Sequence, residues 1–186
     1  MKKSPVVTIV AVGIGAALFF VLGRFVAIPS PVPNTNIATQ YGLLAFMSVL
    51  FGPIAGALIG FIGHTLIDFS YGWGIWWSWV IGSAVFGALM GLLGKRINLA
   101  EGVFGKKEIA KFNLFQVISH LIAWPVVAAV LDVVMMAEPA NKVFLQLLVA
   151  SVGNIVTTAI IGTLLCLAYA AARPKKGSLE EETDED

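Results

Sequence analysis

Residues 6–28 read VVTIVAVGIGAALFFVLGRFVAI, and this segment decides the fold class because Arg24 is its only charged residue. An α-helix of this length covers the hydrocarbon core of a bilayer, which is about 30 Å thick. The segment stops at Pro29-Ser-Pro-Val-Pro33, where the prolines cannot continue a helix. We therefore predict a first transmembrane helix followed by a stiff loop.

The composition of the whole chain agrees with this segment. Of the 186 residues, 58% are hydrophobic and 12% are charged, whereas about 25% of the residues in a typical soluble domain are charged. Lipid is the natural solvent for such a surface, and little sequence remains for a soluble catalytic domain. We predict one all-α integral membrane domain over residues 1–172 and a charged cytoplasmic tail over residues 173–186.

Further apolar segments predict five more helices. The pattern from Ile37 to Phe69 is too long for one span, and Gly52-Pro53 divides it into two helices joined by a tight turn. Three more apolar segments follow, at Ile75–Leu93, Asn113–Met136 and Lys142–Ala172. The predicted architecture is therefore a bundle of six transmembrane helices.

The basic residues predict the orientation of this bundle. They occur at both ends of the chain and between the fourth and fifth helices, namely Lys2, Lys3, Lys95, Arg96, Lys106, Lys107, Lys111, Arg173, Lys175 and Lys176. Cytoplasmic loops carry the excess of lysine and arginine, so both termini are predicted to be cytoplasmic. We expect a multi-pass protein of the plasma membrane that has lipid, but no nucleic acid, as a partner.

Several polar residues share one predicted depth, the outer third of the membrane. They are Arg24, Gln40, Tyr41, His64, Asp68, Asp132 and Gln146. An ionisable residue in a membrane helix is costly unless it faces protein or water and finds a partner. A group of such residues at one depth therefore predicts a single binding site.

Two pairs in this group have alternative interpretations. His64 and Asp68 lie four residues apart on one helical face, so they could orient each other and a ligand, or form half of a metal site. No other clear metal ligands accompany them, and we expect neither a metal nor a cofactor. Arg24 and Asp68 are either ligand contacts or an interhelical ion pair.

The aromatic and loop residues extend the predicted site. Trp76, Trp77 and Trp79 suit an interfacial belt, but they cannot all face lipid on one helix, so Trp76 or Trp79 should point inward and could stack on a flat heteroaromatic ring. The segment Pro29–Asn36 combines stiff prolines with the polar Asn34 and Asn36, which favours a lid over the pocket rather than a plain connector.

The deeper polar residues have a different interpretation. His120 and Asn154 lie further from the predicted site than the group in the outer third. Buried polar side chains of membrane helices commonly hydrogen-bond across to a neighbouring helix. We therefore predict that these two residues are interhelical hydrogen-bonding residues rather than ligand contacts.

Helix one carries two stripes of small residues, Ala11 with Gly15 and Gly13 with Ala17. Small residues at this spacing let another helix approach closely. The approaching helix could belong to this chain or to a second protein.

These motifs together resemble a known family. The stretch from Ala11 to Phe25, AVGIGAALFFVLGRF, the loop PSPVPNTN, and the motifs Gln40-Tyr41-Gly, Phe51-Gly-Pro-Ile-Ala-Gly56 and Gly60-Phe-Ile-Gly-His64 are similar to those of the substrate-binding (S) components of energy-coupling factor (ECF) vitamin transporters. The resemblance spans nearly the whole chain and is densest from Gly13 to Trp79. Within the family, the chain most resembles the subgroup linked to hydroxymethylpyrimidine, a thiamine precursor, or to pyridoxine.

The resemblance implies a partner and a mode of action. Such proteins capture a vitamin or precursor outside the cell and associate, through small residues of helix one, with a transmembrane coupling protein that bears two ATP-binding subunits. They are thought to topple in the membrane to release the substrate inside. The matching small residues here are Ala11 and Gly15, or Gly13 and Ala17.

The sequence lacks the motifs of a motor or an enzyme. Gly94-Lys95-Arg96 has neither the upstream glycine nor the Ser/Thr of a phosphate-binding loop, so energy must come from a partner or from a gradient. The gradient alternative is a carrier or channel that acts alone. No Gly-x-Ser-x-Gly or His-Glu-x-x-His motif is present, and we expect a transport subunit rather than an enzyme.

Overall fold

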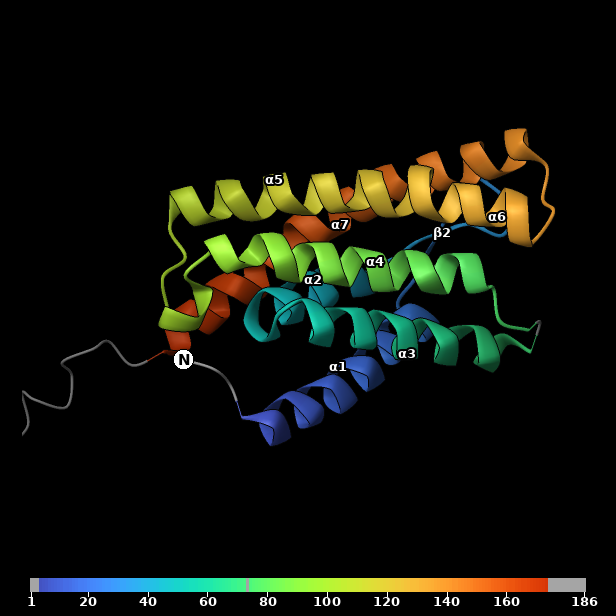
Figure 1. Cartoon of the computed structure of the whole chain (residues 1–186). Helices are drawn as coiled ribbons and strands as arrows, with labels where there is room; N and C mark the ends of the chain where they lie inside the picture. The colour runs from blue at the N-terminus through green and yellow to red at the C-terminus, as the bar shows by residue number, and fades with distance from the viewer. Residues whose placement is uncertain (1–3, 73, 174–186) are drawn as a thin grey trace, which may run out of the picture.

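The computed structural model describes residues 4–72 and 74–173, and it is a bundle of helices that run side by side along one long axis (Figure 1). The helices are α1 (Pro5–Phe25), α2 (Gln40–Phe51), α3 (Pro53–Tyr71), α4 (Trp77–Leu93), α5 (Lys106–Ile122), α6 (Ala129–Met135) and α7 (Ala140–Ala172). A π-helical segment, Ala123–Ala128, joins α5 to α6 as one rod. Two short strands, β1 (Ile28–Pro29) and β2 (Asn36–Ile37), form an antiparallel hairpin between α1 and α2.

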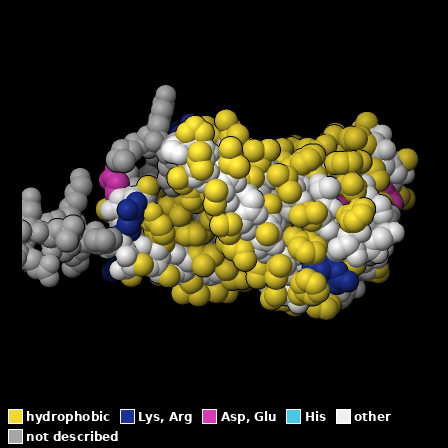
Figure 2. Space-filling model, turned by 90° about the horizontal axis from the view of Figure 1, so that it is seen from below, with side chains coloured by type: hydrophobic (Ala, Val, Ile, Leu, Met, Phe, Trp, Pro, Cys, Tyr) yellow, Lys and Arg dark blue, Asp and Glu magenta, His cyan; other side chains and the backbone are white. Residues whose placement is uncertain are grey.

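The surface has the distribution expected of a membrane protein. Figure 2 shows one face on which hydrophobic side chains cover the middle, while the lysine, arginine and acidic side chains gather toward the two ends. In the described part of the chain, five helical segments are long and apolar enough to cross a membrane, namely Pro5–Phe25, Pro53–Tyr71, Trp77–Arg96, Lys106–Met135 and Ala140–Ala172. The predicted membrane-embedded, all-α character is thereby supported.

The second predicted span differs from the expectation. The predicted division at Gly52-Pro53 is confirmed, because α2 ends at Phe51 and α3 begins at Pro53. However, α2 has only 12 residues, which extend about 18 Å, well short of the bilayer core. The residues before it form the hairpin, since three prolines between Pro29 and Pro33 exclude a longer helix. The count of six complete helical spans therefore stays a prediction.

Six of the eight described lysine and arginine residues, namely Lys95, Arg96, Lys106, Lys107, Lys111 and Arg173, lie at one end of the bundle, whereas Arg24 and Lys142 lie toward the other. The start of α1, the end of α7 and the connection between α4 and α5 all lie at this end (Figure 1). Arg173, at the end of α7, donates a hydrogen bond of 2.7 Å to the carbonyl oxygen of Ala100 in that connection. This arrangement agrees with the predicted clustering, and the cytoplasmic assignment of this end remains a prediction. The tail from residue 174 onward lies outside the described residues.

A seam of small residues joins α3 to α4. A Cβ atom added to Gly56 would collide with the backbone of Gly87, and one added to Gly60 would lie 2.5 Å from the carbonyl oxygen of Ser83. Gly91 meets the backbone at Pro53 in the same way. We call these contacts the glycine seam. Without side chains between them, the two backbones approach more closely than ordinary packed helices.

The stripes of α1 have different surroundings from each other. Ala11 and Gly15 are buried, and a Cβ atom on Gly15 would lie 2.7 Å from Cδ1 of Ile59 on α3. Gly13 and Ala17 are exposed, and a Cβ atom on Gly13 would meet nothing within 4 Å. The first stripe therefore packs inside the chain, and only the second, which we call the outer stripe, is open to another protein.

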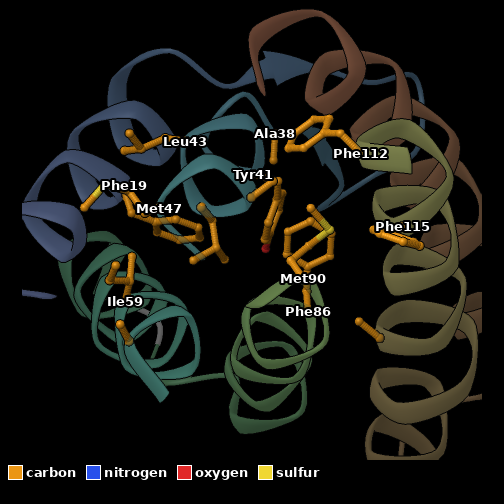
Figure 3. Close-up of a cluster of buried hydrophobic side chains, with 14 of the residues drawn as sticks. Phe19, Ala38, Tyr41, Leu43, Met47, Ile59, Phe86, Met90, Phe112 and Phe115 are labelled. Atoms are coloured by element: carbon orange, nitrogen blue, oxygen red, sulfur yellow. The ribbon is translucent and has the colours of Figure 1, made fainter. Parts of the chain in front are cut away.

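Aromatic side chains fill the core at the middle of the bundle. Tyr41 is buried at the centre of this cluster, with Phe19 on one side and Phe86 on the other (Figure 3). Its ring meets those of Phe19, Phe86 and Trp124 edge to face, at centroid distances of 5.4, 5.4 and 5.2 Å. Edge-to-face packing of this kind gives a rigid, well-defined core. Tyr41 also lines a small cavity, so this core forms part of the floor of the site described next.

Candidate functional site

A cavity of about 300 Å³, lined by polar and aromatic side chains, lies at the end of the bundle opposite the start of α1 and the end of α7. Its walls come from α3, α4, α6, α7 and the hairpin loop, and its lining residues are Asn34, His64, Asp68, Trp76, Trp79, Asp132, Lys142 and Gln146. A smaller cavity of about 130 Å³ shares Asn34, His64, Asp68 and Trp79 with the first. The structure therefore brings most of the predicted polar group to one place.

Asp132 fixes the two inward tryptophans. Its Oδ1 accepts a hydrogen bond from the indole nitrogen of Trp76 at 2.6 Å, and its Oδ2 accepts one from the indole nitrogen of Trp79 at 2.9 Å. The hydroxyl of Ser78 also donates to this carboxylate. Asp132 is 2% exposed, so its charge is stabilised by these donors rather than by bulk water. The result is an aromatic wall held in one orientation.

The third tryptophan has a different position. Trp77 is 41% exposed and stacks on Phe61 at a centroid distance of 6.1 Å, on the outer surface. The prediction that at least one of the three indoles points inward is confirmed, and both Trp76 and Trp79 do so.

His64 and Asp68 form the opposite part of the site. They follow Gly56 and Gly60 at the same four-residue spacing on α3, so the glycine seam leads directly to them. The backbone N–H of Trp76 donates to Asp68 Oδ2 at 2.8 Å, and His64 Nε2 lies 3.7 Å from Asp68 Oδ1. The predicted pairing of His64 with Asp68 is thus present in the geometry.

A hydrogen-bond chain orients the imidazole of His64. Its Nδ1 lies 2.5 Å from the hydroxyl of Ser83, and this hydroxyl lies 2.8 Å from the hydroxyl of Tyr41. Because Ser83 belongs to the glycine seam, the close approach of α3 and α4 sets the position of the ring. The Nε2 atom is thereby left facing Asp68 and the cavity.

Arg24 lies outside the site. It lines neither cavity, and its guanidinium carbon sits over the rings of Tyr71 and Phe25, at 4.3 and 5.5 Å from their centroids. No ion pair joins it to Asp68 among the described residues. The ion pair, one of the two alternatives for Arg24 and Asp68, is therefore not formed in this structure, and the other alternative, a substrate contact of Arg24, stays a prediction that its position outside both cavities does not favour. Gly23 is the residue that faces inward, against Ile67, and Arg24 is turned by about 100° from it.

The hairpin covers the cavity and is attached to α7. Asn34 lines both cavities and Asn36 lines the smaller one. The side-chain amide of Gln146 donates to the carbonyl oxygen of Pro33 at 2.9 Å, and Asn154 Oδ1 accepts from the backbone N–H of Ala38 at 2.8 Å. The hairpin loop therefore lies at the cavity, where the lid was predicted, and its role as a lid stays a prediction.

Other polar residues have separate roles. Gln40 lines the smaller cavity, is 6% exposed, and its Oε1 has no hydrogen-bond donor among the described residues. His120 bonds Thr158 on α7 at 3.1 Å and accepts from the indole of Trp124 at 2.8 Å. The prediction of an interhelical hydrogen-bonding residue is confirmed for His120, whereas Asn154 bonds the backbone of Ala38 outside the helices and lines the smaller cavity.

Asp132 and Gln146 belong to the polar group predicted from depth but were not among the residues expected to contact the substrate, and Lys142 was not predicted to lie at the site. Depth alone gave a signal for Asp132 and Gln146, but depth does not say which way a side chain points. For Asp132, the π-helical segment at Ala123–Ala128 contributes extra residues to its turns, which shifts the face that later residues present. A regular helical period would therefore misplace Asp132.

The fold and the cavity define a class of protein, a helical membrane protein with a binding site for a small polar molecule at one end. The chain matches the family "ECF-type riboflavin transporter, S component" over residues 3–171, and it belongs to that family. It is thus a membrane-embedded component of a vitamin transporter family whose members work with an ECF module of a coupling protein and ATPases.

Similar proteins occur in two bacterial species. A UPF0397 protein of Enterococcus faecalis strain V583 is 50% identical over 181 residues, which cover 97% of this chain and 99% of the relative. A UPF0397 protein of Staphylococcus aureus strain JH9 is 48% identical over 184 residues, covering 98% of this chain and 100% of the relative. Both similarities extend over nearly the whole chain.

Proposed function

We propose that this S component captures a single-ring nitrogen heterocycle of the hydroxymethylpyrimidine or pyridoxine type and passes it to an ECF coupling protein with two ATP-binding subunits. The observation that carries the proposal is the pair of indoles that Asp132 holds beside His64 and Asp68. Fixed indoles supply a stacking face for a flat ring, while the imidazole and the carboxylate supply directional hydrogen bonds.

The size of the cavity supports a small substrate. At about 300 Å³, it lies at the lower end of the range of about 300–1,000 Å³ found for ligand pockets. A single-ring vitamin precursor suits this volume better than the three-ring flavin that the family description names. Riboflavin is therefore the comparison ligand for any binding measurement.

The proposed orientation places the cavity at the outer face. In this arrangement α2 and the hairpin together complete the second of six crossings, and both termini are cytoplasmic. The support is the excess of basic residues at the opposite end, which holds six of the eight described lysine and arginine residues, because the positive-inside rule assigns such an excess to the cytoplasmic face. Hydrocarbon excludes unpaired backbone, and the backbone of buried Ala38, which follows the hairpin, is paired within the protein: its N–H donates to Asn154 Oδ1 and its carbonyl oxygen accepts from the hydroxyl of Thr157.

The outer stripe is the proposed contact with the coupling protein. Gly13 and Ala17 are exposed next to Ile14 and Leu18, which are 55% and 46% exposed. A shallow groove between larger apolar side chains suits close packing of a partner helix. The stripe of Ala11 and Gly15 is already occupied by α2 and α3.

Two measurements test the proposal. The protein is purified alone for calorimetric titration with hydroxymethylpyrimidine, pyridoxine and riboflavin, and it is co-expressed with an ECF module for uptake by vesicles. We expect one single-ring ligand to bind, ATPases to copurify, and uptake to require ATP. Uptake by the protein alone, without any ATPase, would instead support a gradient-driven carrier.

A further inference from the structure

The charged side chains that line the larger cavity differ in whether they are free to interact with a ligand. Its lining includes two carboxylates, Asp68 and Asp132, one histidine, and one lysine, Lys142. The electrostatic interactions of a bound ligand depend on which of these groups already have partners inside the protein. The contacts of each group therefore decide which charge of ligand the cavity can accept.

The cations near the cavity are already engaged. Lys142 Nζ lies 2.7 Å from Glu138 Oε2, and its side chain is 45% exposed at the rim. Arg24 faces the rings of Tyr71 and Phe25 instead of the cavity. Among the described lining residues, no unpaired lysine or arginine remains to neutralise an anionic ligand.

The two carboxylates also differ. Asp132 accepts three side-chain hydrogen bonds, from Trp76, Ser78 and Trp79, and so has no need of a ligand. Asp68 Oδ2 accepts the backbone N–H of Trp76, but Oδ1 lies 3.7 Å from His64 Nε2, beyond hydrogen-bonding distance. Among the carboxylate oxygens of the described residues that line this cavity, Asp68 Oδ1 is the one that lacks a close donor.

We propose that this cavity selects uncharged or cationic heterocycles that donate an N–H hydrogen bond to Asp68 Oδ1, and that it rejects carboxylated or phosphorylated analogues of the same ring. This inference rests on the proposed function, and it narrows the substrate class of the same site. An anion would face the carboxylate of Asp68 at short range with no free cation to offset the repulsion. The unpartnered acceptor Gln40 Oε1, in the adjoining smaller cavity, favours a donor-rich ligand for the same reason.

The test uses pairs of probes that share a ring and differ in charge. Purified full-length protein is titrated by calorimetry with hydroxymethylpyrimidine and its monophosphate ester, and with pyridoxamine and pyridoxic acid. At least one pair of probes should bind. Within that pair, we expect the uncharged or cationic member to have at least about tenfold higher affinity than the anionic member. Equal or tighter binding of the anionic member would overturn the inference.

Three variants assign the selectivity to particular residues. Asp68→Asn should weaken binding of the uncharged or cationic probe by about tenfold to a hundredfold, and should reduce the difference in affinity between that probe and its anionic analogue. Asp132→Asn is the matched control, since it removes the same charge from the same cavity but should weaken both members of a pair alike by loosening the indoles. Glu138→Gln frees Lys142 and should strengthen binding of the monophosphate about threefold to tenfold at low salt. An Asp68→Asn variant that keeps the same difference in affinity between the two members of a pair would contradict the assignment to Asp68.

The failure of this inference can be distinguished from failure of the proposed function. If neither pair binds, the small molecules that the purified protein retains are identified by mass spectrometry. A retained anion would overturn the proposed charge selectivity. A protein that retains nothing would overturn the proposal that the substrate is a nitrogen heterocycle. ATP-dependent uptake and copurification with ATPases measure the transport role separately, whichever ligand is found.

Discussion

The glycine seam between α3 and α4 and the outer stripe of α1 contain the same kind of residue at the same four-residue spacing. In the seam, any added Cβ atom meets the backbone of the facing helix, as at Gly56 and Gly87. On the outer stripe, a Cβ atom on Gly13 meets nothing within 4 Å. A pattern of small residues therefore says that a helix can be approached closely, and the position of that helix in the bundle decides what approaches it.

The two regions also differ in their relation to the site. The seam continues along α3 into His64 and Asp68, so its spacing fixes the distances at the cavity. The outer stripe lies on a different helix, and Arg24, near the cavity end of that helix, is turned away from the cavity. Changes in the seam should therefore affect folding and binding together, whereas changes in the stripe should affect only coupling to a partner.

The largest effect is expected from Gly87→Leu, in the middle of the seam. The side chain has no space against the backbone of Gly56, and overpacking of this kind costs about 1–3 kcal/mol or more. We expect lost thermal stability and lost ligand binding, measured by thermal unfolding in detergent and by calorimetry. Gly13→Leu is the matched control and should retain both. A stable, ligand-binding Gly87→Leu protein would show that the seam tolerates separation.

The next effect is expected from Ala17→Leu, on the outer stripe. A leucine there would hold off a partner helix, so ATP-dependent uptake should fall at least about tenfold while the isolated protein binds its ligand normally. Gly15→Leu sharpens the comparison, because its side chain would collide with Ile59 inside the chain and should impair both activities. Equal loss of binding in the two variants would assign both stripes to internal packing.

A smaller effect is expected from Ser83→Ala, which leaves the backbone contact of the seam intact. The variant removes the hydroxyl that lies between His64 and Tyr41, at 2.5 and 2.8 Å. Loss of such a hydrogen bond costs about 0.5–1.5 kcal/mol, or roughly a twofold to tenfold weaker affinity. Calorimetry should show this loss with little change in the unfolding temperature. A large loss of stability would mean that the hydroxyl serves packing instead of the site.

The smallest effect is expected from Arg24→Gln. The guanidinium lies over two aromatic rings outside both cavities, so ligand affinity should change by less than about threefold and stability by about 0.5–1 kcal/mol. The double variant with Asp68→Asn should bind no better than Asp68→Asn alone. Restored binding in the double variant would indicate an Arg24–Asp68 ion pair in another state of the protein.

The sequence was sufficient for the helices and for much of the site's polar group. The boundary at Gly52-Pro53 was predictable because glycine and proline act locally, and the pairing of His64 with Asp68 was predictable because both lie on one helix. The directions in which Arg24 and the two stripes of α1 point could not be predicted, because they depend on how α1 packs against α2 and α3. Asp132 was found by its depth, but its contact with two indoles depends on the π-helical segment and on the neighbouring helix.

The register of the glycine seam also restricts how the chain can change in length. Insertion of one residue between Gly60 and His64 would turn the rest of α3 by about 100° and advance it by about 1.5 Å, which would remove His64 and Asp68 from the face that follows the seam. The same holds in α4 between Trp79 and Ser83. The connection between Tyr71 and Trp77 lies outside both helices, so it is not part of the four-residue spacing of the seam. Relatives that vary in length within this helical hairpin should therefore do so in that connection, where an added residue leaves the spacing of both helices unchanged.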